Sequence, residues 1–105
     1  MAESVIKLRD RIVNYPDNNS FGPIYGEKIT ASTSYTFSEY PSDSVFLVSY
    51  SNGGLLMITK WSDTSLSMNI IHASDNSITP SVSGLYLTLT LGQGVSSQIA
   101  IIRLK

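Results

Sequence analysis

Residues 45–61, VFLVSYSNGGLLMITKW, hold the strongest local structural signal in this chain of 105 residues. Two apolar runs rich in β-forming residues flank the dipeptide Asn52-Gly53. Asn-Gly between such runs is typical of a tight β-hairpin, because both central residues must adopt positive φ angles. We therefore predict strands over residues 45–50 and 55–61, joined by this turn.

The chain on both sides of the hairpin continues as short β runs separated by turn residues. These runs lie at 24–31, 34–37, 66–72, 85–91 and 98–104. Pro80 marks a loop or a sheet edge, because proline cannot donate a ladder hydrogen bond. Short, regularly spaced strands indicate a sandwich or barrel and not βαβ units. We predict an all-β, antiparallel, jelly-roll-like sandwich of about seven or eight strands, formed by residues 16–105.

Residues 1–15 differ from the rest in charge, and we treat them as a lead-in to the domain. They hold five charged residues, and the other 90 residues hold ten. The 3-4-3 spacing of Val5, Leu8, Ile12 and Tyr15 fits the apolar stripe of a short stem helix. Alternation around Ile6 and Leu8 fits an edge strand equally well. Pro16 ends either element.

A long uncharged run raises the question of what covers its surface. No Asp, Glu, Lys or Arg occurs from Asn76 to Ile102. In the last strand, Ile99 and Ile101 face one way, while Ala100, Ile102 and Leu104 face the other. A strand that is apolar on both faces is normally buried on both, and a two-layer sandwich offers few such places. We expect other copies of the same chain to cover the outer face.

The composition argues against several classes of function. The net charge is −1 and charged residues make up only 14% of the chain, which argues against nucleic acid as a partner, since that binding needs a clustered basic face. No run approaches the roughly 18 apolar residues of a membrane span, so we expect no membrane insertion. Cysteine is absent, which removes thiol chemistry and sulfur-ligated metals. Such a low charge content also protects poorly against self-association.

The pattern of polar residues does not indicate a catalytic residue, a metal site or a cofactor, and we predict none of them. His72, the single histidine, shares a strand face with Leu66 and Met68 and is expected to be a packed or capping residue. Asp43, Asp63 and Asp75 each follow a serine in a turn, where an Asp side chain bonds its own backbone. A calcium site needs several such oxygens together. We therefore expect no enzymatic activity.

Aromatic rings in loops are the best candidates for a binding site. Flat amphipathic rings are good anchors for sugars and for protein partners. Trp61 stands at a strand end close to Asp63, and Tyr40 stands in a turn next to Pro41. We predict Trp61, Tyr40 and Asp63 as ligand-binding residues.

Most of residues 16–105 resembles the tip of a bacteriophage tail-fibre or baseplate receptor-binding protein. The likeness lies in the loop NNSFGPIYG (18–26), the Ser/Thr-rich segment GEKITASTSYTFS (26–38) and a strand, QIAIIRLK, at the end of the sequence. It is a likeness of style, without a specific motif. It implies a homotrimer on the virion whose loops bind a host-surface saccharide.

Two other interpretations stay open. One is a structural or assembly domain of a phage or bacterial appendage without a ligand. The other is a small carbohydrate-binding module. These alternatives would place the protein at a bacterial cell surface or in the cytoplasm.

Overall fold

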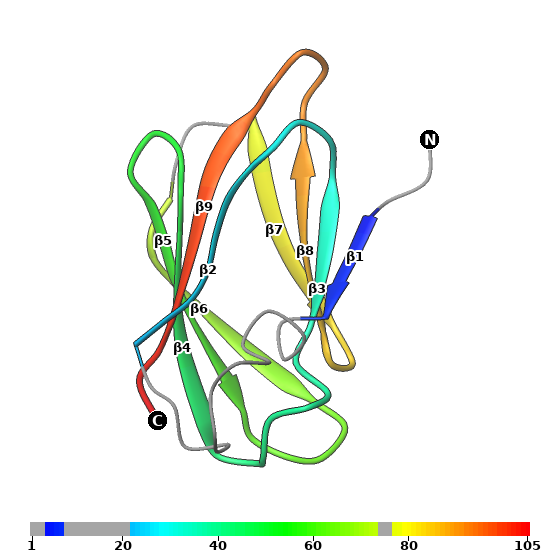
Figure 1. Cartoon of the computed structure of the whole chain (residues 1–105), viewed down its shortest axis with the longest axis vertical. Helices are drawn as coiled ribbons and strands as arrows, with labels where there is room; N and C mark the ends of the chain where they lie inside the picture. Colours follow the sequence, from blue (N-terminus) through cyan, green and yellow to red (C-terminus); the bar gives the residue numbers. More distant parts are fainter. Residues whose placement is uncertain (1–3, 8–21, 74–76) are drawn as a thin grey trace.

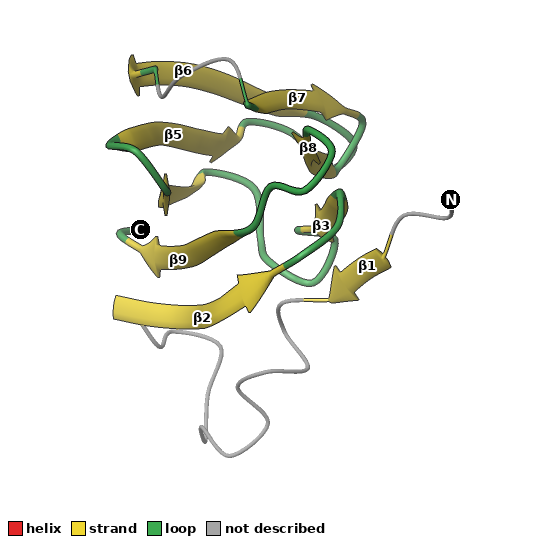
Figure 2. Cartoon of the chain, turned by 90° about the horizontal axis from the view of Figure 1, so that it is seen from above, coloured by secondary structure: helices red, strands yellow, loops and turns green. Residues whose placement is uncertain are grey.

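The computed structural model describes residues 4–7, 22–73 and 77–105, which form nine β-strands in two sheets. One sheet has the order β1-β3-β8-β7, and the other has the order β2-β9-β4-β5-β6. The strands are β1 (Ser4–Lys7), β2 (Gly22–Ile29), β3 (Thr33–Thr36), β4 (Ser44–Tyr50), β5 (Gly54–Lys60), β6 (Leu66–His72), β7 (Ile78–Ser83), β8 (Tyr86–Leu91) and β9 (Ser97–Arg103). Within these ranges no helix is long and apolar enough to cross a membrane. The two sheets lie face to face (Figures 1 and 2), which confirms the predicted sandwich.

In chain order, the strands of two antiparallel pairs lie before and after a meander of three consecutive strands. β2 pairs with β9 and β3 pairs with β8, both antiparallel, so the chain folds back on itself as in a jelly roll. Between these pairs, β4, β5 and β6 run as consecutive antiparallel neighbours within the five-stranded sheet. This arrangement places β9 inside a sheet, with β2 on one side and β4 on the other.

The hairpin between β4 and β5 forms as predicted. Asn52 and Gly53 have φ angles of 67° and 81°, which few residues other than Asn and Gly adopt at low cost. The next residue, Gly54, is required for a different reason. A Cβ atom there would overlap the ring of Tyr50, so a larger residue at position 54 requires this ring to move.

The structure adds one strand, β7, to the predicted ones and decides between the two alternatives for the lead-in. β7, which contains Pro80, was not among the predicted strands, but it pairs with β8 at the sheet edge. Of the two expectations for Pro80, a loop or a sheet edge, the edge is therefore confirmed, and a missing N–H donor is tolerated there. In the lead-in, residues 4–7 form β1, which pairs in parallel with β3, so the helical alternative is wrong over this range. The remainder of the predicted stem helix lies outside the described residues.

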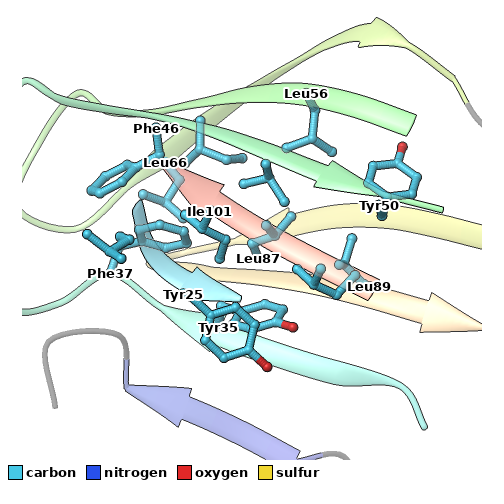
Figure 3. Close-up of a cluster of buried hydrophobic side chains, with 14 of the residues drawn as sticks. Tyr25, Tyr35, Phe37, Phe46, Tyr50, Leu56, Leu66, Leu87, Leu89 and Ile101 are labelled. Atoms are coloured by element: carbon cyan, nitrogen blue, oxygen red, sulfur yellow. The ribbon is translucent and has the colours of Figure 1, made fainter. Parts of the chain in front are cut away.

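The core lies between the two sheets and is rich in aromatic rings (Figure 3). Tyr25 and Tyr35 meet edge to face at 5.1 Å, and Phe37 lies 4.7 Å from Phe46, measured between ring centroids. The fully buried aliphatic side chains come from both layers and are Val48, Leu56, Ile58, Leu87, Leu89, Ile99 and Ile101. The inward leucine face predicted for residues 85–91 is therefore confirmed, and of the two apolar faces of the last strand the one with Ile99 and Ile101 points into the core.

Candidate functional site

Trp61 lies at one end of the sandwich, directly after β5, with 59% of its surface exposed. Two residues further on, Asp63 accepts a hydrogen bond at Oδ1 from the hydroxyl of Ser42, at 2.8 Å. Ser42 belongs to the loop between β3 and β4, and both loops lie at the lower end of the molecule in Figure 1. The bond therefore ties the loop that carries Trp61 to its neighbour.

Lys60, the last residue of β5, holds the β3–β4 loop in place next to Trp61. It is 3% exposed, and its ammonium group donates to the backbone carbonyls of Phe37 at 3.4 Å, of Ser38 at 3.3 Å and of Tyr40. A buried charge is tolerated only when such partners replace its water. The contact fixes the β3–β4 loop against the residue that immediately precedes Trp61, which gives the exposed indole a rigid base.

Tyr40 is not a surface residue, which corrects the expectation drawn from the adjacent Pro41. It is 2% exposed, and its ring packs edge to face on Phe46 at 5.0 Å between centroids. The guanidinium carbon of Arg103 lies 5.0 Å from the centroid of the Tyr40 ring, within the range of a cation–π contact. Tyr40 therefore supports the loop from inside and does not present its ring to a ligand.

Sequence reasoning missed the two buried cations, Lys60 and Arg103. Arg103 is buried and donates through Nη2 to the Ser44 hydroxyl at 3.4 Å and through Nε to the Lys105 carbonyl at 3.2 Å. Strand alternation could have predicted their burial, because residues two positions apart point to the same face of a sheet. Lys60 follows Leu56 and Ile58 at that spacing, as Arg103 follows Ile99 and Ile101.

His72 lies at the β4–β5 hairpin, in a different region from the Trp61 loop. Its Nδ1 lies 2.8 Å from the carbonyl oxygen of Gly53, so the ring caps the hairpin turn. A register shift in β6 pairs His72 with Leu55, whereas plain alternation predicted that it shares a face with Leu66 and Met68. Among the described residues, no group of three or more His, Cys, Asp and Glu residues could hold a metal ion.

A hollow of about 480 Å³ lies beside the edge strand β2. Its lining residues are Pro23, Ile24, Tyr25, Gly26, Glu27 and Ala100. Gly26 and Ala100 are paired across β2 and β9, and their small size leaves space there. Sequence reasoning did not find this hollow, because it depends on the pairing of two distant segments.

The outer faces of the two sheets are chemically different. On the five-stranded sheet, alternation turns outward the apolar residues Val45, Leu47, Leu55, Met57, Ala100 and Ile102, with the polar Ser49, Thr59 and Gln98 at the ends of the same strands. On the four-stranded sheet, the outward residues of β7 and β8 are Thr79, Ser81, Ser83, Tyr86, Thr88 and Thr90. We call the first set the apolar face and the second the hydroxyl face.

Comparison of the chain with protein-family models, with curated proteins and with solved structures found no match. The chemistry of its own side chains is therefore the basis for assigning a function. At the Trp61 end, that chemistry combines a broad apolar ring with a carboxylate that accepts hydrogen bonds.

Proposed function

We propose that this chain is a non-enzymatic adhesion module of a phage virion, the tip of a tail fibre or baseplate. It assembles as a homotrimer and binds a host cell-surface saccharide through the Trp61 loop. The exposed indole of Trp61, on a loop held by Lys60 and Asp63, is the observation that carries the saccharide site. The resemblance of residues 16–105 to phage tips supports the viral assignment.

The chemistry of the loop is the reason for proposing a saccharide as the ligand. One face of a sugar ring is rich in C–H groups and packs well against a flat, rigid aromatic surface. The hydroxyls at its rim need acceptors, and an ionised carboxylate offers about four lone-pair sites. Ser42 donates to one oxygen of Asp63, so sites remain for the sugar. Because a ring and a carboxylate of this kind bind without transforming their ligand, we assign no reaction.

A glycan array tests the binding site. We expect the wild-type protein to bind at least one bacterial surface saccharide and Trp61→Ala to weaken that binding by about 30-fold, the effect of losing an aromatic hot spot. Asp63→Asn keeps the shape but removes the charge, and we expect about a 10-fold loss. Tyr86→Ala is the matched control, because it removes another exposed ring, 47% accessible, from the hydroxyl face. A blank array, or binding unchanged in Trp61→Ala, would overturn the saccharide site.

A structural or assembly domain without a ligand is the second candidate. The apolar face favours it, because that surface suits a permanent contact with protein and needs no ligand. A trimer in solution that binds no saccharide supports this second function. A monomer that binds a saccharide through Trp61 indicates a carbohydrate-binding module instead.

A further inference from the structure

We infer that the apolar face of the five-stranded sheet is the surface through which copies of this chain associate. The inference rests on the self-association in the proposed function, and it names the surface that carries it. It does not depend on the saccharide site, because the Trp61 loop lies at the lower end of the molecule in Figure 1, whereas the residues of the apolar face lie within β4, β5 and β9.

The middle of the face is a row of apolar side chains across three adjacent strands. Leu47 of β4 pairs with Met57 of β5 on one side and with Ile102 of β9 on the other. The residues before and after them in each strand point into the core, so alternation turns these three outward. Ile102 is exposed in the single chain, while Leu47 and Met57 are half-buried, so the row is partly open to solvent.

The charge of the face favours an identical partner. Among the described residues of its five strands, Lys28 is the one Asp, Glu, Lys or Arg that strand alternation and register place on the outer side. A charged partner therefore has almost nothing to recognise there. A second copy presents the same uncharged surface, so the two surfaces can come into contact without burying an unpaired charge. Apolar centres with few charges are also typical of homodimer interfaces.

The outer surface of the sheet is large enough for a stable contact. Five strands spaced about 4.8 Å apart, with about seven residues rising about 3.3 Å each, give the whole outer surface of this sheet an area of about 550 Å² on each copy, and the three strands that carry the apolar face account for about 330 Å² of it. Two such outer surfaces bury about 1,100 Å² together, and a specific interface needs about 1,000 Å².

The hollow beside β2 adjoins this face, because Ala100 belongs to both. A Cβ atom added to Gly26 would meet no other atom within 4 Å, and Gly26 does not have a positive φ angle. A side chain at position 26 is therefore compatible with the folded protomer but fills the space next to Ala100. This makes Gly26 the best place to block the face without disturbing the fold.

Sedimentation equilibrium at micromolar concentration tests the inference on Gly26→Lys, Met57→Lys and Ser81→Lys. Ser81→Lys is the matched control, because it puts the same charge on an exposed strand position of the hydroxyl face. We expect the wild type and Ser81→Lys to have the mass of three protomers. Gly26→Lys and Met57→Lys should fall to the protomer mass of 11.5 kDa and keep the far-ultraviolet circular dichroism of the wild type.

The outcomes separate this inference from the proposed function. A wild-type oligomer that survives both Gly26→Lys and Met57→Lys overturns the assigned surface, while self-association itself stands. A wild-type dimer that both variants dissociate supports the surface and contradicts the homotrimer. A monomeric wild type overturns the inference and the homotrimer together, and the glycan array still decides the Trp61 site.

Discussion

The two sheets of this sandwich are alike on their inner faces and opposite on their outer faces. Inside, both contribute fully buried side chains to one core, such as Leu87 from β8 and Ile58 from β5. Outside, β7 and β8 present mainly hydroxyl groups, whereas the middle of β4, β5 and β9 presents Leu47, Met57 and Ile102, and polar residues appear only toward the strand ends. An antiparallel sheet that faces water on one side normally alternates apolar and polar residues. The hydroxyl face follows that rule and the apolar face does not, so the difference separates a solvated surface from a protein contact.

Truncation of the inner faces should have the largest effect and should be similar in both sheets. Leu87→Ala and Ile58→Ala each remove a fully buried side chain, and we expect each to lower the free energy of unfolding by about 2–5 kcal/mol. Urea denaturation of the two variants, at one protein concentration, measures this. A loss below about 1 kcal/mol in one variant only would show that the core does not extend equally over both sheets.

Replacing the buried Lys60 should lower the free energy of unfolding far more than replacing an exposed lysine. In Lys60→Met the carbonyls of Phe37, Ser38 and Tyr40 lose their shared donor, and we expect a loss of about 2–3 kcal/mol, as for hydrogen bonds to a charged group. Lys105→Met, at an exposed position after β9, should change stability by no more than about 0.5 kcal/mol. Thermal unfolding of both variants checks the contrast. Equal effects would mean that the cluster of carbonyls around Lys60 does not hold the loop.

A smaller effect is expected on the hydroxyl face. The side-chain oxygens of Ser34 and Thr88 lie 2.7 Å apart, in a hydrogen bond between β3 and β8. Thr88→Val keeps the shape but removes one partner, and we expect a loss of about 1 kcal/mol. Thr90→Val, at an exposed position of the same strand, is the control and should have almost no effect. If the two variants are equally stable in urea, the bond contributes nothing measurable.

The smallest effect is a pH dependence at Tyr50, which packs on the inner side of the five-stranded sheet. Burial raises the pKa of its phenol above the ordinary 10.0, because desolvation penalises the phenolate. The folded state therefore holds this proton more tightly than the unfolded state. The resulting stability is fully present below about pH 10 and is lost as the pH rises further. Above about pH 10, wild-type stability should fall more steeply than that of Tyr50→Phe, and parallel curves would contradict this.

Most of the fold was predictable because strand alternation and turn chemistry are local signals. The Asn52-Gly53 turn and the inward leucines of β8 formed as expected. β7 was missed because Pro80 weakens its local pattern, and only the pairing with β8 makes it a strand. The lead-in could not be decided between helix and strand, since the partner that selects the strand, β3, is about 30 residues away in sequence.

The candidate site was less predictable because it depends on contacts between distant segments. Trp61 and Asp63 lie at the surface as expected. Tyr40 does not, because Phe46 and Arg103 provide a buried place for its ring that the neighbouring Pro41 does not reveal. The apolar face was only partly predicted. The last strand indicated an outer surface that needs cover, but the alignment of Leu47 with Met57 and Ile102 required the strand order.

Oxidation of Met57 by hydrogen peroxide, followed by peptide mass spectrometry, tests most directly whether copies of the chain cover the apolar face. Met68, which packs against the core from β6, serves as the internal reference. We expect Met57 to react several-fold more slowly in the wild type than in Gly26→Lys, with Met68 reacting at the same rate in both. Equal Met57 rates in the two proteins would show that the face is open to water and would contradict the account.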